Sequence, residues 1–204
     1  PQSAAYHVPI MLHLKGALDI SALQRSCNAL IERHQSLRTT FKQVEERTVQ
    51  VIAEHQAITL QAQPLDLSNG DRDAAIQAFI ARSSSQLFDL EQGPLLRVEL
   101  SRVSADEHVL VITQHHIVSD GASMQVMVSE LIECYAAFSQ GRQPQLPELP
   151  IQYADYAIWQ RHWMEAGERE RQLAYWTQQL GTEQPVLELP TDRPRPAEQS
   201  YRGA

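Results

Sequence analysis

The chain has 204 residues, and 17 Lys and Arg against 25 Asp and Glu give a net charge of −8. A composition of 43% hydrophobic and 21% charged residues is that of a globular domain and excludes a disordered or collagen-like chain. The acidic balance argues against nucleic acid as a partner. Uninterrupted apolar runs are about five residues or shorter, where a membrane helix needs roughly 20, so we expect a soluble, cytoplasmic protein.

The two cysteines, Cys27 and Cys134, lie on the apolar faces of predicted helices. Such a placement predicts buried free thiols, which favours a reducing compartment, because secreted domains pair their cysteines. The chain begins at Pro1 without a start Met or a basic leader, so we expect further residues upstream.

The predicted elements follow one another in chain order without strict alternation. Strands are expected at 8–15, 38–44, 48–53, 57–63, 95–103 and 108–115. Helices are expected after Asp19, at 71–87, 123–138, 153–166 and 169–180. The strand at 108–115 is apolar on both faces and is therefore expected in the centre of its sheet. This order favours an α+β fold with helices packed on a mixed, largely antiparallel sheet.

The end of the chain differs in composition from the rest. Four prolines lie at positions 185, 190, 194 and 196. They are too many for a helix interior and are typical of an extended segment. We expect one folded unit over residues 1–183 and an extended arm over residues 184–204.

One dense polar cluster, residues 114–121, follows the predicted central strand. The neighbours His115 and His116 are expected on opposite strand faces, so that only one can face a given cavity. Turn-forming residues then bring Asp120 back under the strand end, where it can pair with an arginine or orient an imidazole. Gly121 is expected to allow the reversal without a Cβ clash, and nearby backbone N–H groups can face developing negative charge.

Two other interpretations of the cluster stay open. In the first, the histidines are packed strand-end residues and Asp120 simply caps the following helix. In the second, His116 and Asp120 bind a metal ion, but the nearest other candidates, His108 and His162, lack ligand spacing. We therefore expect no metal site. The chain contains no GxGxxG, Walker, GxSxG or CxxC motif.

The cluster resembles the HHxxxDG signature of the condensation domains of nonribosomal peptide synthetases, which are chloramphenicol-acetyltransferase-like acyltransferases. Residues 33–41 resemble the family's RHExLRTxF motif, with Gln35 in place of Glu. Three further segments are similar to family motifs in the same order: 88–97 (FDL and GPLLR), 153–159 (YADYAIW) and 189–194 (LPTDRP). The resemblance thus covers nearly the whole chain.

The resemblance implies a two-layer sandwich that forms one lobe of a two-lobe domain, with the active site in a tunnel between the lobes. Residues 1–183 would be the N-terminal lobe without its first segment, and residues 184–204 the arm leading to the absent C-terminal lobe. Residues 122–123 and 159–161 are similar to the class that accepts an L-configured donor. As an isolated piece, the chain is expected to be inactive.

The resemblance also implies a reaction, namely amide formation between an acyl or peptidyl thioester donor and an aminoacyl thioester acceptor. Both substrates are held by phosphopantetheine arms of carrier proteins, so no cofactor is bound directly, and the partners are these carriers and neighbouring synthetase modules. His116 would accept a proton from the amine or position it, with His115 and Gly121 in the same motif. Asp120 would support the site by pairing with an arginine, and Tyr156 and Ser123 would contact substrate.

Alternatives remain for several of these residues. The arginine facing Asp120 could be Arg33, Arg38 or one from the absent lobe, and both named arginines could instead meet a helix dipole. Tyr156 and its aromatic neighbours on the same helix side are expected to be core more often than pocket. Three further arginines, a solvated face in the simplest interpretation, could contact an acidic carrier protein: Arg161, Arg169 and Arg171. The whole chain could also be a noncatalytic module that recruits carrier proteins or a tailoring enzyme.

Overall fold

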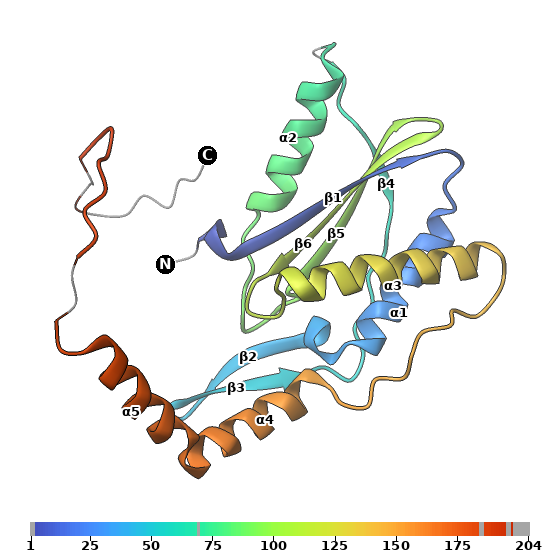
Figure 1. Ribbon diagram of the computed structural model, residues 1–204. Helices are drawn as coiled ribbons and strands as arrows, with labels where there is room; N and C mark the ends of the chain where they lie inside the picture. Colours follow the sequence, from blue (N-terminus) through green and yellow to red (C-terminus); the bar gives the residue numbers. More distant parts are fainter. Residues whose placement is uncertain (1–2, 69, 184–185, 195–196, 198–204) are drawn as a thin grey trace. The chain divides into compact units, whose positions relative to one another are not determined.

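The computed structural model describes residues 3–68, 70–183, 186–194 and 197. Its main sheet has the strand order β1-β6-β5-β4, formed by His7–Lys15, Glu107–His115, Leu96–Ser104 and Ala62–Pro64 (Figure 1). The first three strands pair antiparallel and β4 pairs parallel to β5, so the sheet is mixed. Strands β2 (Thr39–Val44) and β3 (Arg47–Ile52) form a separate hairpin. The α+β prediction is confirmed.

Strand β6 lies in the centre of the sheet, as its apolar sequence predicted. It pairs with β1 on one side, where His115 lies opposite His7, and with β5 on the other. Residues 109–112 are each at most 2% exposed, because helices cover both faces of the strand. The position of β6 places the histidine cluster at the end of the most buried strand.

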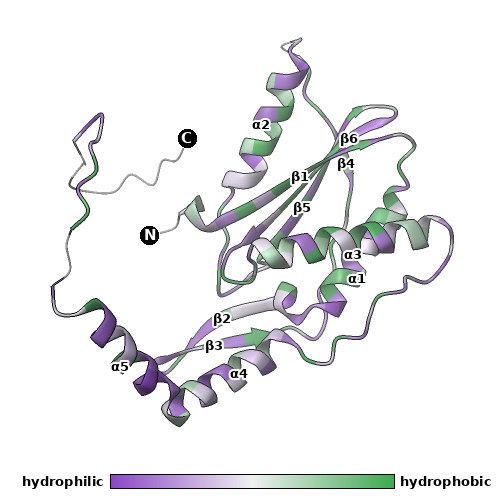
Figure 2. Ribbon diagram, viewed as in Figure 1, coloured by the Kyte–Doolittle hydropathy of each residue, from purple (hydrophilic) through white to green (hydrophobic). Residues whose placement is uncertain are grey.

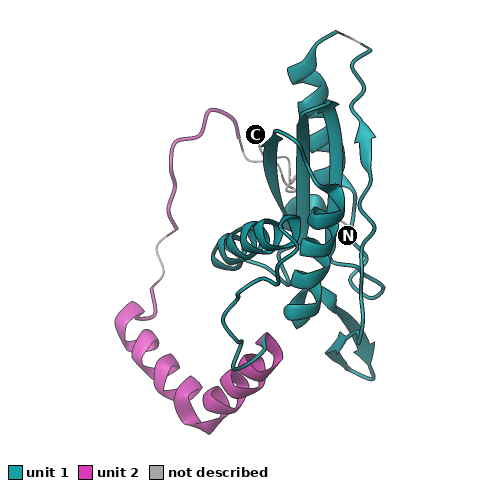
Figure 3. Cartoon of the chain, turned by 90° about the vertical axis from the view of Figure 1, so that its right-hand side faces the viewer, with its two compact units in different colours: residues 1–152 teal, residues 153–204 magenta. Residues whose placement is uncertain are grey.

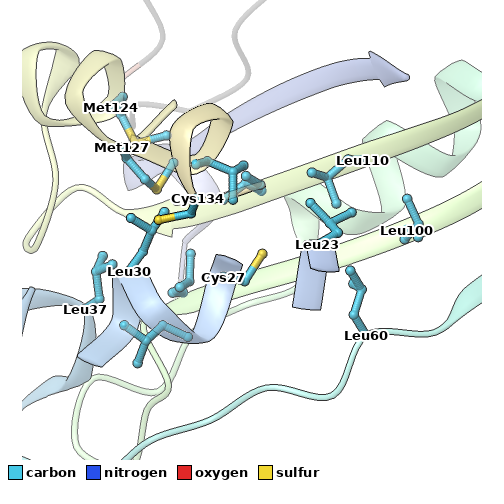
Figure 4. Close-up of a cluster of buried hydrophobic side chains, with 14 residues drawn as sticks. Leu23, Cys27, Leu30, Leu37, Leu60, Leu100, Leu110, Met124, Met127 and Cys134 are labelled. Carbon is cyan, nitrogen blue, oxygen red and sulfur yellow. The ribbon is translucent and has the colours of Figure 1, made fainter. Parts of the chain in front are cut away.

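Helices α1 (Ile20–Arg33) and α3 (Gly121–Ser139) cover one sheet face and build the main core (Figure 4). Leucines from both helices and from β5 and β6 meet there, together with Met124 and Met127. Cys27 and Cys134 are buried free thiols in this cluster, as predicted. Burial raises the pKa of Cys27 to about 12, so this thiol is unreactive at neutral pH.

Helix α2 (Arg72–Ser85) packs on the opposite sheet face, where Phe79 contacts the cluster of Val109 and Val111. The helix begins at its cap Asp71, as expected, but ends two residues before the predicted Leu87, which is exposed. The two-layer arrangement therefore describes α1, α3 and the sheet, and α2 adds a helix on the second face.

The strand predicted at 57–63 is mostly wrong. Only Ala62–Pro64 pairs with β5, because side chains of α1 hold the preceding backbone. Asn28 accepts a hydrogen bond from the Ile58 N–H at 2.8 Å and donates to its carbonyl at 3.2 Å. Gln24 accepts from the Leu60 N–H at 2.7 Å. These amide side chains replace the partners that a strand would have supplied.

The chain divides into two compact units, residues 1–152 and 153–204 (Figure 3). In the second, α4 (Tyr153–Trp163) continues through the π-helical turn η3 (Met164–Glu168) into α5 (Arg169–Leu180). Gly167, at φ 108°, allows the kink between them. Helix α5 carries mostly hydrophilic residues (Figure 2).

This geometric division differs from the boundary predicted at residues 183 and 184, which stays a prediction. The described residues of the predicted arm, 186–194 and 197, form neither helix nor strand; its remaining residues lie outside the described part. Among the helices that the structure describes, none has the length and apolar character to cross a membrane.

Candidate functional site

The candidate site forms where β6 ends and the chain turns into α3. The His115 carbonyl accepts hydrogen bonds from the Val118 N–H at 3.1 Å and the Ser119 hydroxyl at 3.2 Å, which closes a tight turn. The His116 N–H donates to the Tyr6 carbonyl at 2.8 Å and ties this turn to the start of β1. The backbone of both histidines is therefore held by neighbouring segments.

Both histidines line the same cavity, which has a volume of about 870 Å³. The expectation that only one could face a given cavity is therefore wrong. The alternation of side chains holds only within a strand, and β6 ends at His115, so His116 belongs to the turn. His116 is exposed, whereas His115 is half-buried. The cavity is lined by Ser3, Tyr6, His7, Leu87, Phe88, Asp89, Leu90, Glu91, His115, His116 and Ile117.

His115 is held as a neutral imidazole. Its Nδ1 accepts a hydrogen bond from the Ile117 N–H at 3.1 Å, so in the neutral ring the proton is on Nε2. Burial lowers the pKa of His115, and the charges of His7 and His116 lower it further. His115 is therefore suited to donate a hydrogen bond from Nε2, and its Nδ1 is already occupied.

Aromatic rings pack around His115 at the wall of the cavity. The Tyr6 ring stacks on it with centroids 6.1 Å apart, and His7 approaches it edge-on at 6.1 Å. His7 is a site residue that sequence reasoning missed. Its one signal, the alignment of the first strand with the central strand, required knowledge of which strands pair. Its Nδ1 lies 2.7 Å from the Ser84 carbonyl, which makes that nitrogen the proton donor.

Asp120 caps α3. Its carboxylate accepts a hydrogen bond from the Ser123 N–H at 2.8 Å, and its own N–H donates to the Ser123 hydroxyl at 2.8 Å, which completes a capping box. These bonds lower the pKa of Asp120, with smaller contributions from the Ala122 N–H and the charge of His116. Asp120 is exposed, so the expected inward-facing brace is wrong and the helix-cap interpretation describes this residue.

The arginines expected opposite Asp120 bind elsewhere. The Arg33 Nε donates to Glu130 at 3.1 Å and its Nη2 donates to the Pro147 carbonyl at 2.5 Å. The Arg38 Nη1 donates to the Ala53 carbonyl. A pair between Asp120 and either arginine is therefore wrong for this unit, because both guanidinium groups bind other partners.

Glu130 is a second residue that sequence reasoning missed. It is 8% exposed and its other oxygen lies 2.6 Å from the His34 Nε2, so it joins the end of α1 to α3. The signal was a carboxylate on the apolar face of the helix that contains Met127 and Cys134. Such a residue needs a buried partner.

The predicted conformational role of Gly121 is wrong. Its φ lies outside the left-handed region, and a Cβ built there would meet no atom within 4 Å. The expected anion-facing N–H groups are also partly occupied, because Asp120 accepts hydrogen bonds from Ala122 and Ser123. Ser123 takes part in the capping box with its N–H and its hydroxyl. Its role as a substrate contact stays a prediction.

Tyr156 lies in the second unit, within a row of aromatic rings along α4. Its ring is 5.9 Å from that of Tyr153 and 5.7 Å from that of Trp159, which stacks on Trp163. None of these residues is buried in the described chain, so the expectation that they form core is wrong. The substrate contact of Tyr156 stays a prediction.

The arginines considered for carrier binding are partly neutralised. Arg169 pairs with Glu170 at 2.7 Å, and Arg171 pairs with Glu168 at 2.5 Å. These pairs agree with the simpler interpretation of a solvated face, and carrier binding stays a prediction. Within the described residues, no three His, Cys, Asp or Glu side chains are grouped to hold a metal ion.

Comparison with known proteins gives a consistent result. The family model described as condensation domain matches residues 1–204. The linear gramicidin synthase of Brevibacillus parabrevis includes a protein that is 47% identical over 205 residues, which is 100% of this chain and 3% of that protein. The chain thus spans a small part of such a relative.

Solved structures with the same fold have also been found. The X-domain in a complex with OxyB from teicoplanin biosynthesis is 35% identical with a TM-score of 0.82, and the match covers 94% of this chain and 42% of that chain. The starter condensation domain of rhizomide synthetase RzmA has a TM-score of 0.78 at 21% identity, and the match covers 88% and 43% of the two chains. The second likeness concerns the fold alone.

Proposed function

The chain belongs to the condensation domain family, and from this premise we propose that it supplies one lobe of a domain that forms amide bonds in nonribosomal peptide synthesis. The donor is an acyl or peptidyl thioester and the acceptor is an aminoacyl thioester, each on the phosphopantetheine arm of a carrier protein. The arms are parts of the substrates. Neighbouring modules of a cytoplasmic synthetase would be the other partners, and an L-configured donor is the expected class.

The reaction itself needs alignment more than activation. The acceptor nitrogen attacks the thioester carbonyl, a C–N bond forms, the C–S bond breaks, and the proton lost by nitrogen balances the departing thiolate. Because the thioester is already activated, holding the two reactants together can contribute about 7 kcal/mol or more. No covalent intermediate on the protein is required.

The observation that carries this proposal is the position of His116. Its ring is exposed at the edge of a cavity of about 870 Å³, while its backbone is held by the Tyr6 carbonyl. An imidazole there can accept the proton of the attacking amine or hold the amine by a hydrogen bond. We assign His116 this role and give Gly121 the role of leaving space in front of α3.

The neighbouring residues would act through His116. His115, with Nδ1 bonded to the Ile117 N–H, fixes the turn, and Asp120 fixes the start of α3 and places a negative charge near His116. Arg33 supports the lobe through Glu130. An arginine of the second lobe remains a candidate partner for the Asp120 carboxylate. Ser123 and Tyr156 stay proposed substrate contacts.

The test uses the complete synthetase that contains this chain, with both carrier proteins loaded and the dipeptidyl thioester measured. We expect His116→Ala to lower the rate at least about 100-fold, the low end for general acid–base action. His55→Ala is the control, because His55 is exposed and lies outside the cavity. Near-normal turnover by His116→Ala contradicts the proposal.

A second candidate function is a noncatalytic module that recruits carrier proteins or a tailoring enzyme. The observation that favours it is the likeness to an X-domain that was solved in a complex with OxyB. In this case the intact synthetase would bind its partner, this domain would form no amide bond, and His116→Ala would leave binding and product yield unchanged. The same assay therefore separates the two functions.

A further inference from the structure

Arg97 lies on β5 and reaches across to the end of α2. Its Nη1 donates to the Gln86 carbonyl at 2.9 Å and the Ser83 carbonyl at 3.2 Å, and its Nη2 donates to the Leu87 carbonyl at 3.4 Å. Helix α2 ends at Ser85, so these carbonyls lie where a helix runs out of N–H partners. One guanidinium thus closes the helix end.

The same guanidinium lies over the ring of Phe88, 4.4 Å from its centroid, within the range of a cation–π contact. Phe88 lines the cavity and meets two imidazoles there. Its ring is edge-on to His7 at 4.9 Å and to His115 at 6.3 Å. A chain of contacts therefore runs from Arg97 through Phe88 to the histidine that precedes His116.

The segment after Phe88 is held independently. The Asp89 carboxylate accepts hydrogen bonds from the Glu91 N–H at 2.9 Å and the Gln92 N–H at 3.1 Å. The Phe41 N–H donates to the Leu90 carbonyl at 2.8 Å. With that side fixed, the contact with Arg97 determines how Phe88 lies against the imidazoles.

We propose that Arg97 is a positioning residue that holds Phe88 against His7 and His115 and thereby sets the cavity wall beside His116. The simpler alternative is a helix cap without effect on the site. The catalytic consequence rests on the proposed function, whereas the contact itself does not. The inference explains why the short segments FDL at 88–90 and GPLLR at 93–97 occur together: they carry the two halves of one contact.

The first experiment measures amide formation by the complete synthetase with Arg97→Met and Arg97→Lys. A displaced wall should lower kcat about 10- to 100-fold in Arg97→Met, with KM for the acceptor carrier changed less than about twofold. Arg97→Lys should recover part of the rate, because a lysine keeps the cation and loses the planar fork. Arg82→Met is the matched control, since Arg82 lies 5.4 Å from the Phe79 ring, away from the cavity.

A double-mutant cycle tests the contact. If Arg97 acts through Phe88, then Arg97→Met combined with Phe88→Leu should lose no more rate than the worse single variant. Independent, multiplying effects would overturn the proposal. Thermal unfolding of each variant identifies any that fails to fold, and the conservative Arg97→Lys and Phe88→Leu variants then decide.

A readout without catalysis separates this inference from the proposed function. In the 204-residue chain labelled with ¹⁵N-histidine, Arg97→Met should shift the ring resonances of His7 and His115, and Arg82→Met should not. Unchanged resonances overturn the inference. Shifted resonances together with no product from the unmutated synthetase would support the contact and reject the proposed function.

Discussion

At the scale of the residue, the two histidines differ in what surrounds their rings. His115 is half-buried among Tyr6, His7 and Phe88, and its Nδ1 is occupied by the Ile117 N–H. The His116 ring is exposed beside the same cavity. The end of the strand between them produces this difference, and it leaves the second histidine as the group that can meet a substrate.

Asp120→Ala tests the capping role of the carboxylate. Because Asp120 is an exposed N-cap, we expect the free energy of unfolding to fall by about 1 kcal/mol, the usual cost of losing such a cap, and the variant to remain folded. Urea unfolding measures the change. Asp120→Ser is the control, since a hydroxyl also accepts from the N2 or N3 N–H. A misfolded or insoluble Asp120→Ala would instead indicate a buried ion pair.

The same cap predicts a pH dependence. The pKa of Asp120 in the folded chain lies below its ordinary value of 3.8, so the unfolded chain binds the proton more readily. The stabilisation is therefore complete above that value and is lost as the pH falls through the lower folded pKa. The difference between the native chain and Asp120→Ala should shrink in acid, and a difference that grows in acid contradicts it.

At the scale of the element, the loop between α2 and β5 shows how a short segment is fixed. Asp89 closes its turn, Arg97 holds its beginning, and Gly93 adopts a φ of +63°. A Cβ at Gly93 would lie 2.8 Å from the Thr40 Cγ2 of β2. The glycine is therefore required for two reasons, the left-handed backbone and the close approach of the hairpin.

Gly93→Ala separates these two reasons when it is compared with Gly141→Ala. Gly141 has φ +69°, and a Cβ there meets no atom within 4 Å, so its substitution costs only the backbone strain. We expect Gly93→Ala to lower the free energy of unfolding by about 1–3 kcal/mol more, the cost of forcing an extra carbon into a packed site. Equal losses in urea unfolding would show that Thr40 moves aside at no cost.

At the scale of the whole molecule, the described buried residues all lie in the first unit, between Ala22 and Ala137. Glu130 connects distant parts of this unit: it binds Arg33 and His34 at the end of α1, and Arg33 in turn donates to the Pro147 carbonyl. The linkage ties α1 and α3 to the segment that leads toward the second unit.

Glu130→Ala should therefore be far more damaging than its position on a helix suggests. The change leaves the partly buried Arg33 without its carboxylate, and removal of one member of such a pair costs about 3 kcal/mol or more. Glu133→Ala is the control, since Glu133 makes one exposed hydrogen bond with the Gln145 N–H at 3.3 Å. Similar losses from both variants in urea unfolding would contradict the role of Glu130.

The sequence alone determined the fold class, most of the helices and strands, the central position of β6 and the segment that carries the site. These follow from periodicity, turn residues and apolar runs, which act within about ten residues along the chain. It also identified His116, because the motif order is a property of the sequence.

Only the tertiary structure decided which residues meet across the fold. The choice of Glu130 over Asp120 as the partner of Arg33, the entry of His7 and Arg97 into the site, and the loss of the strand at 57–61 depend on contacts between distant segments. Such contacts are set by which strands pair and which helix faces pack. Local pattern does not encode them, because each side chain there satisfies a group many positions away.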